Sequence, residues 1–245
     1  MTSSTTSIIL NWNNLNVSKD SIRRIKRESP LIVVDNGSTD GSKLYFADKL
    51  KPSEYIQMGY NAGNALARNE AIKRVKTKYF FLLDGDILYV PGTIKTLEKL
   101  IERYPECGCL GVNDPIRVRR TGMNGTLCSQ EADIKAETGR IYKGFPMAWT
   151  QYGLFRNTGQ LFPSEEPFDK TGMGYEDSWY YHEMKSKGLE SYFITKPLYY
   201  HDAHAGKREL DKLKIDTNEP ARRKAFEDKW GRNDWLDKEL RIEIA

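Results

Sequence analysis

The sequence predicts an α/β fold in which a mixed, mostly parallel sheet is flanked by helices. Three observations indicate this class. Over the first hundred residues, short apolar runs alternate with amphipathic segments, the apolar runs are continuous, and polar turn residues separate the segments. Continuous apolar strands are typical of parallel sheets that helices cover on both faces, and the helical segments supply the crossovers that parallel strands need.

Four strands and four helices are expected in this first part. The apolar runs predict strands over residues 7–10, 31–34, 55–58 and 79–83. The amphipathic segments predict helices over residues 19–27, 41–50, 64–75 and 91–101, and Asp40 is placed to cap the second of them.

The second part of the chain is less regular. Glycine, asparagine and threonine are frequent over residues 107–142, which predicts an irregular or hairpin-like insertion. Beyond it we expect a strand over residues 148–155, a helix over 176–187 that Gly188 ends, and short strands over 192–194 and 198–200. A charged helical tail is expected after Gly206, with docking anchors at Phe226, Trp230 and Trp235.

Composition excludes several classes of protein. The 245 residues carry a net charge of +4 and are 39% hydrophobic, which indicates a globular chain. The longest apolar stretch, at 79–83, is far shorter than the roughly 20 residues of a membrane-spanning helix, and the first residues lack the basic start of a signal peptide. Three cysteines without metal-ligand spacing favour a reducing compartment. We therefore expect a cytoplasmic protein, either soluble or peripheral at the inner membrane surface.

Polar residues stand at or just past the end of each predicted strand in the first part. They are Asn11, Asp35, Asn61, and the pair Asp84 and Asp86. Because ligands of parallel sheets bind beyond the carboxyl ends of the strands, these residues are expected to converge on one rim.

Five segments, in order along the chain, resemble the sequence blocks of a known family. They are residues 8–13 (IILNWN), 32–41 (IVVDNGSTDG), 61–69 (NAGNALARN), 81–86 (FLLDGD) and 172–177 (GMGYED). Together they resemble the inverting family 2 glycosyltransferases of the GT-A fold over about residues 7–204, and residues 226–231 resemble that family's C-terminal helix. The resemblance implies a single GT-A domain over 1–204, with a nucleotide-sugar half at about 1–106 and an acceptor half at about 107–204. Residues 205–245 would form a helical extension packed on this domain.

Two carboxylates separated by one small residue, Asp84-Gly85-Asp86, suit a divalent cation with hard oxygen ligands. Such a cation would neutralise the charge that develops on a diphosphate leaving group. The resemblance implies that Asp86 is a direct ligand of Mn²⁺ or Mg²⁺ and that Asp84 contacts ribose or the metal. It also implies a histidine ligand after a late strand, for which His201 is favoured by position and His204 is the alternative. The bland alternative is a polar turn.

The nucleotide sugar is expected to lie along the same rim. The resemblance implies that Asp35 accepts a hydrogen bond from the base; an Asx turn is the alternative for Asp35. Asn11 is a further candidate contact, with a role of its backbone alone as the alternative. Asn61 and Gly63 precede a helix start, where backbone N–H groups suit a diphosphate. Arg68, one turn inside that helix, is expected to reach phosphate or base, with an ordinary surface arginine as the alternative.

The catalytic base is expected at the start of the helix over 176–187. Transfer with inversion needs a base that takes the proton of the acceptor hydroxyl. The resemblance places that base at Asp177, with Glu176 binding or orienting the acceptor, while two acids stabilised by the helix dipole are the alternative. Trp179 and Arg117 are assigned to the acceptor site, against the alternatives of a core aromatic and plain surface charge.

These residues lead to a functional hypothesis. We expect a metal-dependent inverting glycosyltransferase that moves a hexose from a nucleoside-diphosphate sugar, with UDP-glucose or a related UDP-hexose as the default donor. A glycan, a lipid-linked sugar, a peptide and a modified nucleobase in DNA all stay open as acceptors. Two other classes compete: a nucleotidyltransferase on a related fold, and a non-catalytic sugar- or partner-binding module.

Overall fold

A computed structural model describes residues 3–112, 141–143, 152–165, 175–194, 199–201, 219–230 and 242–243. Arg117, Cys128, His204 and Trp235 lie outside these ranges, so the expectations that concern them are not addressed by the structure.

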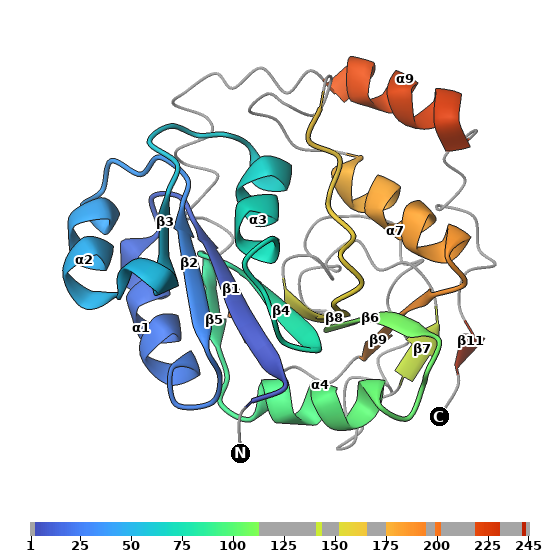
Figure 1. The fold of residues 1–245 in the computed structure, drawn as a ribbon, viewed down its shortest axis with the longest axis horizontal. Coiled ribbons are helices and arrows are strands. Elements are labelled where there is room, and N and C mark those ends of the chain that lie inside the picture. Colours follow the sequence, from blue (N-terminus) through green and yellow to red (C-terminus); the bar gives the residue numbers. More distant parts are fainter. Residues whose placement is uncertain are drawn as a thin grey trace.

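Nine strands form one sheet in the order β11-β7-β9-β6-β8-β4-β1-β2-β3 (Figure 1). Their bounds are β1 Thr5–Asn11, β2 Leu31–Asp35, β3 Tyr55–Gln57, β4 Tyr79–Asp84, β6 Cys107–Val112, β7 Ile141–Lys143, β8 Tyr152–Arg156, β9 Glu190–Ile194 and β11 Ile242–Glu243. Only β7 and β8 run against the direction of the other strands in this sheet. The prediction of a mixed, mostly parallel sheet is therefore confirmed.

The described helices lie on both faces of this sheet, as continuous apolar strands require. They are α1 Leu15–Ile25, α2 Ser42–Lys49, α3 Asn64–Ile72, α4 Thr93–Ile101, α7 Glu176–Ser186 and α9 Glu219–Trp230, with a 3₁₀ turn, η1, at Pro52–Glu54. None of these helices combines the length and apolar character needed to cross a membrane.

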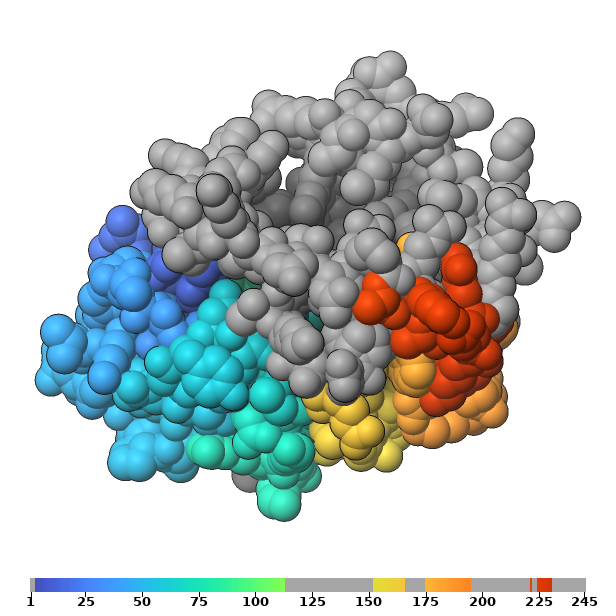
Figure 2. All heavy atoms as spheres, turned by 90° about the horizontal axis from the view of Figure 1, so that it is seen from above, coloured from blue at the N-terminus to red at the C-terminus, as the bar shows by residue number. Residues whose placement is uncertain are grey.

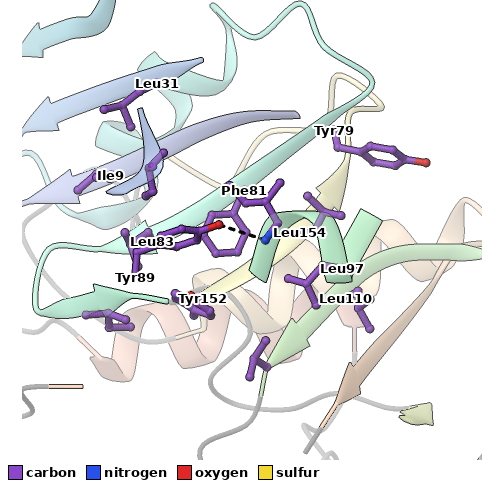
Figure 3. Packing of buried hydrophobic residues seen from close by; sticks show 14 of the residues in the cluster. Ile9, Leu31, Tyr79, Phe81, Leu83, Tyr89, Leu97, Leu110, Tyr152 and Leu154 are labelled. Carbon is purple, nitrogen blue, oxygen red and sulfur yellow. Dashed lines mark hydrogen bonds between the residues drawn. The ribbon is translucent and has the colours of Figure 1, made fainter. Parts of the chain in front are cut away.

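Alternate residues of each central strand supply two separate cores. Ile9 and Phe81 belong to the core that α1, α2 and α4 cover, whereas Ile8 and Phe80 belong to the core that α3 and α7 cover. Figure 3 shows the first core, where Phe81 lies near Tyr89 and Tyr152. Helix α9 packs outside α7 (Figure 1).

The prediction of an irregular segment from residue 107 was wrong at its start. Strand β6 lies between β8 and β9, well inside the sheet. Its glycines have low strand propensity, so the sequence does not predict a strand here. Packing explains the glycine at position 108, because a Cβ there would lie 2.5 Å from Sδ of Met184 on α7. The helix approaches the strand so closely that only glycine fits without movement.

A small second sheet was also missed. It pairs β5, Ile87–Tyr89, with β10, Tyr199–His201, in antiparallel register. The hydroxyl of Ser21 on α1 fixes β5, because it donates to the carbonyl of Ile87 at 2.9 Å and accepts the N–H of Tyr89 at 3.0 Å. A three-residue strand held by a helix side chain leaves little periodic signal in the sequence.

Candidate functional site

The carboxyl ends of the central strands meet at one edge of the sheet. In the strand register Asn11 stands opposite Asp35, and Leu10 stands opposite Asp84. The pairing of the strands thus brings Asn11, Asp35 and Asp84 to one rim, as expected.

Asn11 lies beneath this rim. Its side chain is fully buried, and its amide donates to the hydroxyls of Ser38 at 3.1 Å and Ser42 at 3.0 Å. Its carbonyl oxygen accepts the hydroxyl of Ser18 at 2.6 Å. These bonds join β1, the loop after β2 and helix α1, so the described role of Asn11 is positioning; its contact with a nucleotide stays a prediction.

The loop after β2 is locked to the loop before α3. Asp35 is buried, and its carboxylate accepts the N–H of Ser38 at 3.1 Å, which is the Asx-type turn given as the alternative for this residue. Its contact with a base stays a prediction. Asn36 accepts the N–H of Ala62 at 2.9 Å and donates to the side-chain oxygen of Asn61 at 3.0 Å. Sequence reasoning gave Asn36 no role, although its place directly after Asp35 at a strand end is a signal that could have found it.

Glycine is required where these two loops touch. Gly37 has φ +80°, and a Cβ at this position would lie 2.4 Å from the carbonyl carbon of Tyr60. At the end of the second loop, Gly63 has φ +79° and its N–H donates to the side chain of Asn61 at 3.1 Å, directly before α3 begins. The backbone N–H groups at this helix start suit a phosphate, so the assignments of Asn61 and Gly63 stay predictions with a compatible geometry.

The Asp84-Gly85-Asp86 turn is attached to β1 and α1. The N–H of Gly85 donates to the carbonyl of Leu10 at 2.8 Å, and the hydroxyl of Ser18 lies 3.2 Å from the carbonyl of Gly85. A Cβ on Gly85 would lie 3.0 Å from both of these neighbours, so the turn has no room for a side chain between its two carboxylates. The backbone therefore fixes the position of both acids.

The donor chemistry of this turn fits a hard divalent cation. Asp84 and Asp86 offer carboxylate oxygens that are partly accessible, and β10 brings His201 opposite Ile87, the residue after Asp86. Among the side chains that the structure describes, no three His, Cys, Asp or Glu residues gather as metal ligands, and the His201 side chain is not among those described. The metal-binding roles of Asp84, Asp86 and His201 stay predictions.

Arg68 connects this turn with helix α7. Its guanidinium donates to Oδ1 of Asp84 at 3.0 Å and to Oδ1 of Asp177 at 3.4 Å, although the two carboxylates are 93 positions apart in the sequence. The Arg68 side chain is 3% exposed, whereas those of Asp84 and Asp177 are 22% and 28% exposed. The arginine is thus a buried support beneath two acids that solvent can reach.

The environment of Arg68 keeps it charged. Burial opposes the charge, but the carboxylates of Asp84 and Asp177 outweigh burial and raise the pKa of the guanidinium. The ring of Phe162 lies on the other side, 5.5 Å from the guanidinium carbon. Sequence reasoning expected Arg68 to contact the nucleotide; the structure shows it in contact with two of the predicted site carboxylates.

The predicted base and its neighbour occupy the first turn of α7. Glu176 is buried and Asp177 is partly exposed, and both benefit from the positive end of the helix dipole. Tyr175, directly before them, has φ +67°. The third predicted residue of this helix, Trp179, packs against Trp230 of α9 with ring centroids 6.1 Å apart, so its assignment to the acceptor stays a prediction.

Two curated bacterial proteins resemble parts of this chain. A teichoic acid poly(glycerol phosphate) polymerase of Staphylococcus epidermidis is 42% identical over 60 residues, which are 23% of this chain and 8% of that protein. The putative teichuronic acid biosynthesis glycosyltransferase TuaG of Bacillus subtilis is 36% identical over 77 residues, which are 30% of this chain and 31% of that protein. The matches therefore span less than a third of each relative.

Solved structures share the fold at low sequence identity. The mannosyltransferase PcManGT from Pyrobaculum calidifontis, in complex with GDP-Man and Mn²⁺, has a TM-score of 0.52 at 17% identity, over 80% of this chain and 55% of that one. S. aureus TarS has a TM-score of 0.57 at 15% identity, over 97% of this chain and 43% of that one. TarS 1-349 in complex with UDP-GlcNAc has a TM-score of 0.53 at 15% identity, over 93% of this chain and 71% of that one. These likenesses confirm the predicted GT-A fold.

A family model gives the same answer from the sequence. The model described as glycosyl transferase family 2 matches residues 8–163, which is more than half of the chain. The matched range includes the second half of β1, the loops around Asp35 and Asn61, and the Asp84-Gly85-Asp86 turn. The chain therefore belongs to glycosyl transferase family 2.

Proposed function

We propose that this protein is a metal-dependent, inverting hexosyltransferase that uses a UDP-sugar as donor and Asp177 as its base. The observation that carries the proposal is the double contact of Arg68. One guanidinium reaches Asp84, on the turn assigned to the donor, and Asp177, on the helix assigned to the acceptor. The buried guanidinium of Arg68 thus contacts both Asp84, which is assigned to the donor, and Asp177, which is assigned to the acceptor.

The proposed reaction is a single displacement at the anomeric carbon. The acceptor oxygen forms a bond to C1 of the sugar on the face opposite the diphosphate, and the bond between C1 and the diphosphate oxygen breaks. Asp177 accepts the proton that leaves the acceptor hydroxyl. Glu176, its neighbour in the first turn of α7, orients the acceptor.

Arg68 supports this step without touching the reacting atoms. Its contact with Asp177 restricts the rotamers of that carboxylate, so that the carboxylate is oriented for proton transfer. The Asp177 side chain is 28% exposed beside Arg68, so Arg68 orients the carboxylate and an acceptor can still reach it.

Asp86, with Asp84 and His201 as further ligands, would hold the divalent cation. When bound, the cation supplies positive charge that stabilises the departing diphosphate. The partial exposure of Asp84 and the fixed backbone of Gly85 support this assignment. PcManGT, a structural neighbour, is described in complex with Mn²⁺.

The relatives suggest which substrates to try first. TarS is described in complex with UDP and with UDP-GlcNAc, which supports a UDP-sugar as donor. Both curated relatives are named for teichoic or teichuronic acid, which supports acceptors of these types ahead of peptides and modified DNA.

A donor and acceptor screen tests the proposal. Purified protein is incubated with Mn²⁺ and each of UDP-glucose, UDP-GlcNAc and GDP-mannose, with and without teichoic or teichuronic acid fragments, and released nucleotide is measured. We expect UDP release that needs the cation and increases with an acceptor, and a mass gain on that acceptor equal to one sugar residue of the donor used. Release of pyrophosphate instead of UDP would indicate nucleotidyl transfer, and binding of donors without turnover under any condition would indicate a binding module.

The Asp86→Asn variant separates the role of the metal from that of the fold. We expect it to unfold at the same temperature as the wild type but to lose the Mn²⁺-dependent UDP release. Full activity in this variant would contradict the assignment of Asp86 as the metal ligand.

A further inference from the structure

Helix α7 presents a continuous aromatic stripe to α9. Tyr175, at its N-terminal end, and Trp179 and His182 follow the spacing i, i+4 and i+7, which places them on one side of the helix. The rings of Phe226 and Trp230, also four residues apart, lie against this stripe. The two helices are side by side in Figure 1, and Figure 2 shows the red surface of α9 against the orange surface of α7.

Each ring of α9 has a defined place. Phe226 is fully buried, with its centroid 5.6 Å from that of Tyr175 and 5.2 Å from that of His182. Trp230 stacks on His182 at 5.7 Å and meets the ring of Trp179 edge-on at 6.1 Å. Aromatic pairs with such geometry each contribute roughly 0.5–1.5 kcal/mol beyond the area that they bury, so the two helices hold each other firmly.

A lysine side chain adds to this contact at the C-terminal end of α9. The ammonium of Lys229 lies 4.3 Å from the ring centroid of Trp179 and 4.9 Å from that of Trp230. These distances are within the range of cation–π attraction. Trp179 is thus contacted by two successive residues of α9.

The opposite side of α7 belongs to the core. Tyr180 stacks on Phe162 with centroids 4.4 Å apart, and Met184 is buried against the same face of the sheet. Phe162 in turn lies under the guanidinium of Arg68. Helix α7 is therefore packed between α9 on one side and the core residues next to Arg68 on the other.

Tyr175 links the aromatic contact to the two acids. Its φ of +67° is a conformation that costs an L-residue with a side chain roughly 1–2 kcal/mol. It persists only where surrounding contacts determine it, and Phe226 is such a contact. Because Glu176 and Asp177 are the next two residues, the backbone of Tyr175 sets the direction in which the first turn of α7 begins.

We propose that α9 is a positioning element of the active site, which through Phe226 and Trp230 holds the first turn of α7 and keeps Asp177 in the orientation that transfer needs. This inference rests on the proposed function for its effect on turnover, but its effect on the first turn of α7 does not. Neither α9 residue is placed at the reacting atoms.

The test compares substitutions on two sides of α9. Phe226→Ala and Trp230→Ala remove the rings that face α7, Trp230→Phe keeps a ring there, and Lys224→Gln changes a side chain that is 76% exposed on the same helix. For each variant we measure kcat, KM for the donor, the affinity for UDP, and amide hydrogen exchange at residues 175–179.

We expect kcat to fall by about tenfold or more in both alanine variants, since a misplacement of about 1 Å in a catalytic group costs up to about 100-fold. Donor KM and UDP affinity should stay within about twofold, because the residues assigned to the donor lie on β1, β2, β4 and α3 and in the loop before α3, and none lies on α7 or α9. Exchange should become faster at residues 175–179 and stay unchanged in β4. Trp230→Phe should recover most of kcat, and Lys224→Gln should match the wild type.

Two results would overturn the inference. One is unchanged exchange at residues 175–179 in both alanine variants. The other is a loss of UDP affinity equal to the loss of kcat, which would mean that α9 only stabilises the whole fold. If exchange rises as expected but the wild type transfers no sugar, the positioning role stands and the proposed function fails.

Discussion

The two acidic turns of the candidate site are built in different ways. The Asp84-Gly85-Asp86 turn follows a central strand, and its position is set by backbone contacts such as that between the N–H of Gly85 and the carbonyl of Leu10. The Glu176-Asp177 turn begins a helix, and side chains position it: Arg68 on one side and Phe226 on the other, the latter through Tyr175. Backbone contacts thus hold the turn proposed for the donor, whereas side-chain packing holds the turn proposed for the acceptor. We call these the proposed donor side and the proposed acceptor side.

Removal of the link between the two turns should have the largest effect. Arg68→Met keeps the length of the side chain but leaves Asp84 and Asp177 as neighbouring carboxylates without their shared cation. We expect turnover to fall by about 100-fold or more and the free energy of unfolding to fall by about 1–3 kcal/mol, less than for a fully buried pair because water reaches both acids. Steady-state kinetics and urea unfolding measure the two effects.

Arg68→Lys is the matched control for this link. A lysine keeps the charge but presents a single ammonium, which cannot reproduce the fork that contacts two carboxylates. Stability should recover more than turnover does. Wild-type turnover in either variant would show that the double contact has no part in catalysis.

On the proposed donor side, Gly37→Ala should be the most damaging small substitution. Its Cβ would meet the backbone of Tyr60 at 2.4 Å, and the backbone cannot move as a side chain does. We expect a loss of about 2–4 kcal/mol in the free energy of unfolding and weaker UDP binding. Gly59→Ala has a similar φ, +79°, with open space around the Cβ, and should cost about 1 kcal/mol. Equal effects of the two substitutions would contradict the locking of the two loops.

On the proposed acceptor side, the corresponding substitution is Gly108→Ala. The clash there, at 2.5 Å, is with the flexible side chain of Met184, so we expect a smaller loss of about 1–2 kcal/mol in the free energy of unfolding. The shift of α7 that this clash causes should lower turnover, whereas the affinity for UDP should be retained. In a Met184→Ala background the cost of Gly108→Ala should shrink, and a double-mutant cycle measures this. Additive effects would show that Met184 is not the obstacle.

The part of the fold that can be predicted from the sequence differs between the two sides. The first four strands, their helices and the rim positions follow from continuous apolar runs and the polar residues after them, and these predictions are confirmed. Strand β6 was missed because Gly108 is needed for the close approach of Met184, which lies far away in the sequence. Strand β5 was missed because a serine of α1 holds it. Contacts between residues far apart in sequence leave no local pattern.

The same limit applies to the site. Asp84 and Asp177 were each singled out from their own segments, but nothing in either segment indicates that Arg68 joins them. Arg68 was expected at the surface or on the nucleotide, but it is buried against Asp84, Asp177 and Phe162, two of which lie far from it in the sequence. Trp179 was assigned to the acceptor site from its own segment, and nothing in that segment indicates the contacts of its ring with α9.

The smallest effect is expected at high pH, from one tyrosine on each side. Burial and the nearby Asp35 carboxylate raise the pKa of Tyr55 to about 12, and burial with Glu190 raises the pKa of Tyr181 to about 12. A raised folded-state pKa stabilises the fold below the ordinary value near 10, and this contribution is lost between pH 10 and 12. Urea unfolding at pH 8 and pH 11 should show a smaller decline in Tyr55→Phe and in Tyr181→Phe than in the wild type. An identical decline in all three proteins would contradict this.

The role of Asp177 as the base is tested most directly by Asp177→Asn, measured for UDP-sugar binding and for transfer in the same preparation. The amide keeps the size of the side chain but cannot take a proton, so we predict that transfer falls by about 10²- to 10⁴-fold while donor affinity stays within about twofold. Transfer at the wild-type rate, with donor binding intact, would contradict the proposed role of Asp177.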